Sequence, residues 1–280
     1  MKKKLLAIAA CAAAAALSCA MLAGCSGSSS SDTKAATDSS SGDFTLVVGF
    51  DQSYPPYGFI GDDGKATGFD LDLAQAVAEK NGWKVELQPI DWDAKDALLA
   101  QGNINCIWNG FTMEGREDGY TFSDAYMLNE QVVVVKSGSS ISDFAGLSGK
   151  TVMTQVDSAA LDVLEGDQAS VAATFAGGAP QTIADYNNAF MQLDSGLIDA
   201  VACDLSIAQY QIAQNPGKYT QLSEPLSSEH YAVGFKKGET ELAAKVTASL
   251  KELDADGTVK QLCEKYADYG LSYDNWVLGK

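Results

Sequence analysis

The chain has 280 residues, of which 46% are hydrophobic and 20% charged, so it can build a sizeable core and is not globally disordered. Its 19 Lys and Arg residues stand against 37 Asp and Glu residues, a net charge of −18, which argues against a nucleic-acid partner because phosphate binding needs a cationic face. The single histidine, His230, argues against a His-rich metal site, and we expect no metal and no cofactor.

The N-terminus has the pattern of a secretory signal peptide. Three lysines at 2–4 precede an uncharged run over 5–24, and this run ends in the sequence LAGC. The ending resembles a bacterial lipobox, in which Cys25 is acylated and becomes the mature N-terminus. An uncleaved membrane anchor is the alternative, since about 20 apolar residues can span a bilayer. Both interpretations place the remaining chain outside the cytoplasm, tied to the cell membrane.

Residues 26–43 are predicted to be a flexible tether. They contain eight Ser among 18 residues and show no apolar periodicity, so they cannot bury a face. The root-mean-square reach of such a segment is roughly 23 Å, from 5–6 Å times the square root of its length. The folded part is therefore expected to stay close to the membrane.

From residue 45 onward, strands and helices alternate in two series. The first series has expected strands at 45–50, 84–88 and 105–108, with helices at 70–80 and 93–101. The second has strands at 151–155, 171–175 and 198–203, with helices at 158–165, 182–194 and 205–214. Continuous apolar strands between helices indicate a mostly parallel sheet covered on both faces. Two such series, about 100 residues apart, predict an α/β protein with two lobes.

Three cysteines fall in this folded region, Cys106, Cys203 and Cys263. They lack the short paired spacing of a zinc site or a disulfide framework. We expect three buried small hydrophobic side chains. A bridge between Cys106 and Cys263 is the open alternative.

Polar and aromatic side chains gather where the expected strands end. Ligands of open α/β sheets bind outside the carboxyl ends of the strands. The residues at or just after those ends are Asp51, Tyr54, Trp92, Asn109, Gly110, Thr112, Arg116, Asp157, Ser158 and Asp204. One guanidinium, several carboxylates, hydroxyls and aromatic rings form the set that a free amino acid requires.

Arg116 is the single arginine beside 18 lysines. Its planar fork can grip a carboxylate with two hydrogen bonds, which lysine cannot do. We therefore expect Arg116 to bind the carboxylate of the ligand. The alternative is a surface residue paired with Glu114 or Glu117.

The other candidates also have plainer alternatives. Asp204 follows an apolar strand and needs a partner when buried, which a ligand ammonium would provide, although it could instead cap the helix at 205–214. Ser158 could offer its hydroxyl and a backbone N–H to an anion or simply cap a helix, and Asp157 could cap or face the pocket. Tyr54 and Trp92 could sandwich the ligand side chain or belong to the core.

Four motifs in this order resemble the extracytoplasmic binding proteins of ABC importers for polar amino acids. They are FDQSYPPY at 50–57, TGFDLDLA at 67–74, WNGFT at 108–112 and DADGT at 254–258. The resemblance extends from about residue 45 to 269.

The resemblance implies a periplasmic-binding-protein fold of type II, in which two lobes joined by two crossing segments close on the ligand. The implied segments are a signal peptide at 1–24, a tether at 25–43, a first lobe at 44–135 and 227–280, and a second lobe at 136–226. A monomer that delivers its amino acid to an ABC transporter permease is implied as well.

The same resemblance assigns roles to the candidate residues. Arg116 and Thr112 would bind the α-carboxylate with help from Ser158, while Asp204 and the Gly110 carbonyl would take the α-ammonium. The side chain of the ligand would meet Asp51, Tyr54, Trp92 and Asn109.

Two departures from the family pattern affect these roles. The stretch from Thr112 to Arg116 is one residue shorter than the commoner spacing, and Asp157 occupies a loop where many members have small polar residues. The added carboxylate disfavours acidic ligands, so we expect a polar amino acid with a neutral or cationic side chain.

Three other functions remain open. The same fold serves a dehydratase of prephenate or arogenate, which would need a general acid that the sequence does not nominate. A sensor lobe of a receptor and a surface protein without a transport role are the other two. We expect a binding protein rather than an enzyme.

Overall fold

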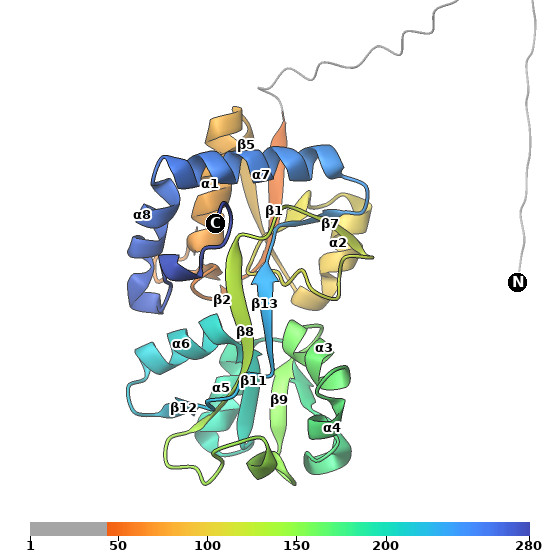
Figure 1. Ribbon diagram of the computed structural model, residues 1–280, viewed down its shortest axis with the longest axis vertical. Coiled ribbons are helices and arrows are strands. Elements are labelled where there is room, and N and C mark those ends of the chain that lie inside the picture. Colours follow the sequence, from red (N-terminus) through yellow and green to blue (C-terminus); the bar gives the residue numbers. More distant parts are fainter. Residues whose placement is uncertain (1–43) are drawn as a thin grey trace, which may run out of the picture. The chain divides into compact units, whose positions relative to one another are not determined.

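The structure is a computed structural model that describes residues 44–280 (Figure 1). The expected signal peptide at 1–24, the acylated Cys25 and the tether up to residue 43 lie outside the described residues. Among the helices of 44–280, none combines the length and the apolar character that crossing a membrane requires.

The first sheet is built around β1 (Thr45–Asp51), where Leu46, Val48 and Phe50 have no solvent exposure. β1 is parallel to both β5 (Lys84–Ile90) and β6 (Cys106–Ile107), as the apolar strand pattern predicts. The antiparallel strands β14 (Gly234–Lys236) and β7 (Tyr120–Phe122) extend the sheet, giving the order β5-β1-β6-β14-β7. Its helices are α1 (Phe69–Asn81), α2 (Lys95–Gln101), α7 (Thr240–Ala255) and α8 (Thr258–Lys265).

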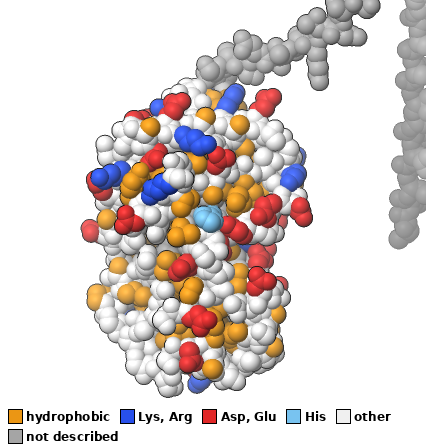
Figure 2. Space-filling model, viewed as in Figure 1, with side chains coloured by type: hydrophobic (Ala, Val, Ile, Leu, Met, Phe, Trp, Pro, Cys, Tyr) orange, Lys and Arg blue, Asp and Glu red, His pale blue; other side chains and the backbone are white. Residues whose placement is uncertain are grey.

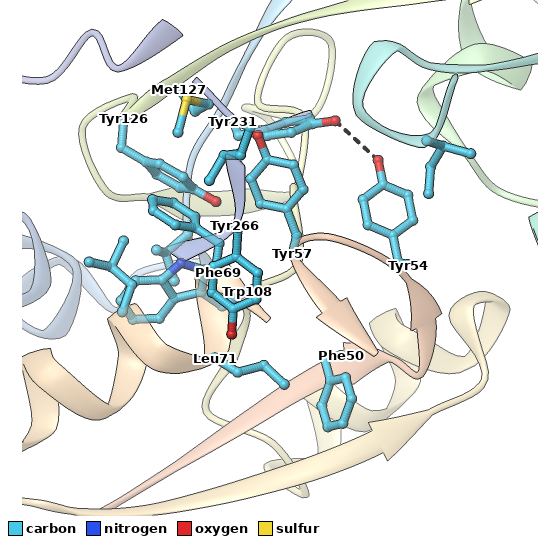
Figure 3. Packing of buried hydrophobic residues seen from close by; sticks show 14 of the residues in the cluster. Phe50, Tyr54, Tyr57, Phe69, Leu71, Trp108, Tyr126, Met127, Tyr231 and Tyr266 are labelled. Carbon is cyan, nitrogen blue, oxygen red and sulfur yellow. Dashed lines mark hydrogen bonds between the residues drawn. The ribbon is translucent and has the colours of Figure 1, made fainter. Parts of the chain in front are cut away.

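A small antiparallel sheet follows β1 directly. It consists of β2 (Ser53–Tyr54), β3 (Gly58–Ile60) and β4 (Ala66–Thr67). β2 carries Tyr54 away from the carboxyl end of β1. The aromatic residues of this region pack together with those of neighbouring elements (Figure 3).

The second sheet has the order β10-β9-β11-β8-β12, and β13 also pairs with β8. Its strands are β8 (Met127–Lys136), β9 (Val152–Gln155), β10 (Gln181–Ile183), β11 (Ala200–Asp204), β12 (Tyr219–Gln221) and β13 (Ser227–Tyr231). Its helices are α3 (Ala159–Glu165), α4 (Ala169–Ala172), α5 (Tyr186–Ser195) and α6 (Leu205–Gln214). Short 3-10 turns complete the described chain: η1 (Trp92–Ala94), η2 (Ala145–Leu147), η3 (Ala176–Gly178), η4 (Ala267–Tyr269) and η5 (Tyr273–Asn275).

Two neighbouring chain segments connect the two sheets, and β8 and β13 run side by side there (Figure 1). Backbone hydrogen bonds from Ser123 to Val233 and from Tyr126 to Tyr231 join the stretch that precedes β8 to the end of β13 and the residues that follow it. The predicted lobe boundaries, at 135/136 and 226/227, assigned β8 and β13 to the first lobe. In the structure both strands pair within the second sheet, where β8 binds β11, β12 and β13, and the lobe bounds themselves stay a prediction.

One predicted strand is wrong. Residues 171–175 were expected to be a strand, but α4 (Ala169–Ala172) occupies the first part of this run, and β10 lies at Gln181–Ile183, where a helix was expected to begin. A short apolar run does not distinguish a buried helix from a buried strand by its periodicity. Ala172 and Phe175 are buried in the structure, and burial of these apolar residues is compatible with a helix as well as with a strand.

The three cysteines of the described chain are confirmed as small buried residues. Cys106, Cys203 and Cys263 are all free and at most 2% exposed. The alternative bridge between Cys106 and Cys263 is not formed.

Candidate functional site

A pocket of about 230 Å³ lies between elements of the two sheets. Its lining combines a tyrosine and a tryptophan, the single arginine, small polar residues and a buried carboxylate: Tyr54, Trp92, Gly110, Thr112, Arg116, Gln155, Ser158, Ala159 and Asp204. Seven of the ten residues proposed from the sequence lie in this lining, whereas Asp51, Asn109 and Asp157 do not. Gln155 and Ala159 were not proposed.

Arg116 enters the pocket from the side of the first sheet. Its Nη2 donates a hydrogen bond to Asp162 Oδ2 of α3 at 2.8 Å, and its guanidinium lies 4.9 Å from the centre of the Phe111 ring. The side chain is 12% exposed. The alternative pairing with Glu114 or Glu117 is not formed: Glu114 binds His230 Nδ1 at 2.7 Å, and Arg116 pairs with Asp162. A guanidinium has five N–H donors, so the bond to Asp162 leaves donors for a ligand carboxylate.

Asp204 ends β11 at the pocket and is 4% exposed. Its Oδ1 accepts hydrogen bonds from Asn129 Nδ2, Gln131 Nε2 and the Tyr231 hydroxyl at 2.7–2.9 Å. Asp204 precedes α6, but its side chain makes no capping hydrogen bond there. Burial raises the pKa of Asp204, and a cation placed beside it would offset this effect by favouring the ionised carboxylate.

Tyr54 and Tyr231 link the pocket to the segment that connects the sheets. Their hydroxyls face each other at 3.0 Å (Figure 3), and the Tyr231 hydroxyl also donates to Asp204. Tyr54 is 6% exposed and packs near Tyr57 and Tyr186. Its ring therefore belongs to both the pocket and the core.

Gly110 has a positive φ of 58°, a conformation that glycine adopts readily. A Cβ atom there would lie 2.9 Å from Tyr231 and 3.0 Å from Tyr54, so the lining leaves no room for a side chain. The Gly110 amide donates to Asp70 Oδ2 at 2.6 Å.

Asp70 fixes this glycine from beneath the pocket. It has no solvent exposure and also accepts hydrogen bonds from the Tyr126 hydroxyl at 2.7 and 2.8 Å. Burial raises the pKa of Asp70 to about 7.

Asn109 does not line the pocket. Its side chain is 1% exposed, lies against Gly58, and hydrogen-bonds no described residue through either its oxygen or its nitrogen. The expected contact between Asn109 and a ligand side chain therefore has no geometric support in this conformation.

Thr112 and Ser158 both have protein partners. The Thr112 hydroxyl donates to Glu229 Oε1 at 2.7 Å, which brings a second buried carboxylate, missed in the sequence, next to the pocket. Ser158 caps α3 by accepting from the Leu161 amide at 3.2 Å, and its hydroxyl also lies 3.2 Å from Thr154 Oγ1. Both roles open to Ser158, cap and pocket residue, are compatible with this position.

Asp51 lies in an adjoining pocket of about 710 Å³, and Trp92 lines both pockets. Asp51 is 6% exposed, and its carboxylate accepts a hydrogen bond from Gln155 Nε2 at 2.6 Å across the cleft. Burial raises the pKa of Asp51. The second pocket is also lined by Asp91, Asp93 and Asp185, so it is acidic.

Asp157 is not part of the pocket lining and pairs with Lys95. It has a φ of 58°, and its carbonyl oxygen accepts from Trp92 Nε1 at 3.1 Å. Lys95 is 2% exposed although it is a lysine, and no local sequence pattern predicts this burial. The carboxylate that was expected to repel acidic ligands is therefore neutralised by Lys95.

Replacing Asp157 with Asn should destabilise the protein, because it leaves the buried Lys95 ammonium without its carboxylate. We expect the free energy of unfolding to fall by about 1–2 kcal/mol, less than for a fully buried pair, since the Asp157 side chain is 46% exposed. Urea unfolding would measure this. Asp162→Asn, at a more exposed carboxylate, is the control and should cost less than about 1 kcal/mol. Equal effects of the two substitutions would contradict the prediction.

The chain matches the family described as "Bacterial extracellular solute-binding proteins, family 3" over residues 46–269. It is 30% identical over 225 residues to the L-cystine-binding protein TcyJ of Escherichia coli K12, covering 79% of this chain and 82% of that protein.

Two solved structures extend the comparison. An ABC uptake transporter substrate-binding protein from Streptococcus pneumoniae with bound histidine is 33% identical, with a TM-score of 0.78 and coverage of 84% of this chain and 95% of the other. An ancestral amino acid-binding protein described as a precursor of cyclohexadienyl dehydratase is 30% identical, with a TM-score of 0.71 and coverage of 79% and 95%. These likenesses confirm the predicted type II periplasmic-binding-protein fold with two α/β lobes.

Proposed function

Because the chain belongs to the bacterial extracellular solute-binding proteins of family 3, we propose that it binds one free polar amino acid in the pocket between its lobes and delivers it to an ABC transporter permease. The observation that carries this proposal is the convergence of Arg116 and Asp204 on one pocket. The two residues are 88 positions apart and come from different lobes. A guanidinium and a buried carboxylate suit the two charged ends of an amino-acid zwitterion.

The proposed binding mode follows from the donors and acceptors in the lining. Arg116 would grip the α-carboxylate with the N–H groups that Asp162 does not use, and Ser158 lies in the same lining. Asp204 would accept the α-ammonium, with the Gly110 carbonyl as a further acceptor. Tyr54 and Trp92 would cover the ligand from the first lobe.

Closure of the two lobes would complete this site, since each lobe supplies only half of the lining. Contacts across the cleft are present in this conformation, including Gln155 with Asp51 and Trp92 with the Asp157 carbonyl. A ligand shifts the lobes toward closure only through contacts that it makes better in the closed form. A ligand that contacts Arg116 and Asp204 at the same time meets that condition, because the two residues come from different lobes.

The charge of the surroundings supports a neutral or cationic ligand side chain. The charge of Asp157 does not support this preference, because the ion pair with Lys95 neutralises the Asp157 carboxylate. The acidic pocket next to Trp92, with Asp51 at its inner wall, argues for it instead. An acidic side chain extending toward that pocket would meet like charge, which is unfavourable.

The cellular setting is proposed from the sequence. Acylation of Cys25 after removal of 1–24 would tether a monomer to the outer side of the cell membrane, with 25–43 as the spacer. The proposed lobes are 44–135 with 227–280 and 136–226, and the crossing segments between them are those that carry β8 and β13, which pair within the second sheet.

A ligand screen tests the proposed function. We expect at least one polar amino acid to raise the melting temperature of the purified protein, because a ligand that binds only the folded state stabilises it. Mass spectrometry of small molecules released on denaturation would identify a ligand that co-purifies. If no amino acid raises the melting temperature and none is released, the proposed function is refuted and a surface protein without a transport role is favoured.

A dehydratase remains the enzymatic alternative, since one similar structure is described as a precursor of such an enzyme. We expect the chain to bind without catalysis. Incubation with prephenate or arogenate should give no product, and turnover of either acid would overturn this expectation.

A further inference from the structure

Two carboxylates, not one, lie at the end of the pocket that holds Asp204. Glu229 is 3% exposed and Asp204 is 4% exposed. Neither belongs to any ion pair within residues 44–280. Two buried negative charges without a cation are costly, so the structure must compensate for them in another way.

The strand register explains why the two carboxylates meet. β8 pairs with β11 so that Gln131 lies opposite Asp204, and it pairs with β13 so that Asn129 lies opposite Glu229. Residues two apart on a strand point to the same face. Asn129 and Gln131 therefore share one face with both acids, while Glu130 between them points the other way.

Asp204 and Glu229 together accept both hydrogens of each side-chain NH₂ group of Asn129 and Gln131. Asn129 Nδ2 and Gln131 Nε2 each donate to Asp204 Oδ1 and to Glu229 Oε1, at 2.7–2.9 Å. An NH₂ group has two hydrogens, so neither amide nitrogen can offer another bond. The Tyr231 hydroxyl adds a third donor to Asp204, and the Thr112 hydroxyl adds one to Glu229.

We propose that Asp204 and Glu229 together hold one proton while the pocket is empty and release it when the ammonium of an amino acid binds beside Asp204. Glu229 is then a positioning residue, which sets how strongly the site selects an ammonium and how binding depends on pH. The O–H bond of the shared proton breaks, and the proton passes to the solvent. The inference rests on the proposed function, because it assigns the ligand ammonium to Asp204.

The electrostatics agree with the geometry. Burial raises the pKa of both carboxylates, and the charge of Asp204 raises the pKa of Glu229 further. Two strongly interacting acids lose their protons in two steps that belong to the pair. A cation beside Asp204 favours the ionised form, so binding lowers the pKa of the pair and releases the proton.

The neighbouring titratable groups do not provide this proton themselves. Those within reach of the charge of Asp204 are Tyr54, Tyr57, Tyr186, Cys203 and Tyr231, and burial raises the pKa of each. They are therefore neutral near pH 7. Arg116 lines the same pocket but pairs with Asp162.

Two measurements on the full chain test the proposal, with Glu229→Gln as the variant and Glu130→Gln as the matched control. Glu130 lies on the same strand as the amides but on the opposite face, so its substitution removes a charge without touching the pair. The infrared absorption of protonated carboxyl groups at pH 7 reports on the empty protein. We expect Glu229→Gln to show one protonated carboxyl fewer than the wild type, and Glu130→Gln to show no difference.

The second measurement is calorimetric titration with L-arginine, L-glutamine and L-cystine at pH 6, 7 and 8, in two buffers that differ in ionisation enthalpy. We expect the wild type to release up to one proton per amino acid bound. Its affinity should rise by up to about tenfold per pH unit until the pH passes the raised pKa. The affinity of Glu229→Gln should depend less on pH than that of the wild type, because the charge of Glu229 no longer opposes ionisation of Asp204.

The outcomes separate the inference from the proposed function. Equal infrared spectra for wild type and Glu229→Gln, or unchanged proton release by Glu229→Gln, would overturn the inference while amino-acid binding stands. An infrared difference without binding of any of the three amino acids would uphold the shared proton but refute its release by a ligand. Binding by Glu229→Gln with a flatter pH profile than that of the wild type would support the proposal and exclude misfolding as its cause.

Discussion

Arg116→Ala should reduce amino-acid affinity by about 100-fold or more while leaving the fold intact. Each charge-assisted hydrogen bond from the guanidinium to a carboxylate contributes about 1.5–3 kcal/mol, and 1.4 kcal/mol corresponds to a tenfold change in affinity. The fold should survive because the one ion pair that Arg116 forms within residues 44–280, to Asp162, involves a carboxylate that is 58% exposed. Calorimetric titration would measure the affinity, and circular dichroism would report on the fold.

Two control variants distinguish a ligand contact from a structural one. Arg116→Lys keeps the charge but loses the planar fork, so it should bind with an affinity between those of the wild type and the alanine variant. Asp162→Asn removes the partner of Arg116 and should change the affinity less than about threefold. Unchanged affinity in Arg116→Ala would remove the carboxylate clamp from the proposed binding mode.

Asp70→Ala should destabilise the protein by about 2–5 kcal/mol and weaken ligand binding as well. It leaves the Gly110 amide and the Tyr126 hydroxyl buried without their acceptor, and each unsatisfied group costs about 1–3 kcal/mol. Binding should weaken because Gly110, which lines the pocket, loses the contact that fixes it. Urea unfolding and calorimetric titration would measure the two effects.

Asp70→Asn is the matched control, since it keeps an acceptor of similar shape and should cost less than the alanine variant. It also isolates a pH effect. Because burial raises the pKa of Asp70 to about 7, the folded state holds this proton where the unfolded state has lost it. The stability contribution of Asp70 therefore falls as the pH rises from about 4 to 7, by at most about 1.4 kcal/mol per pH unit. A wild-type slope that is retained in Asp70→Asn would contradict this assignment.

Much of the fold could be predicted from residue patterns alone. The strand at 45–51 and the helices at 69–81 and 205–214 have the expected type and place, because their apolar residues follow the period of a fully buried strand or an amphipathic helix. The run at 171–175 could not be assigned in this way, since it is too short to show a period. The membership of β8 in the second sheet depends on pairing with strands up to 104 residues away, as between Met127 and Tyr231, which no local pattern encodes.

The residues of the pocket could be predicted only in part, because the burial of some charged residues depends on contacts with distant segments of the chain. Arg116 and Asp204 stand out by their rarity or by their place at the end of a strand, and both line the pocket. Glu229 and Lys95 look like ordinary surface charges in the sequence, because their burial depends on partners 117 and 62 residues away. For Glu229, the alternation of inward and outward residues on β13 would have been the available signal.

The paired connection between the lobes restricts how the molecule can open. Its two segments are joined by backbone hydrogen bonds, such as those from Ser123 and Tyr126 to the partner segment, so bending one bends the other. A single flexible strand would allow the lobes to twist freely, but a hydrogen-bonded ribbon resists shear and yields most easily about one axis. The two halves of the lining should thus return to the same alignment on every cycle, and an arriving solute would find its contacts without a search over many relative orientations.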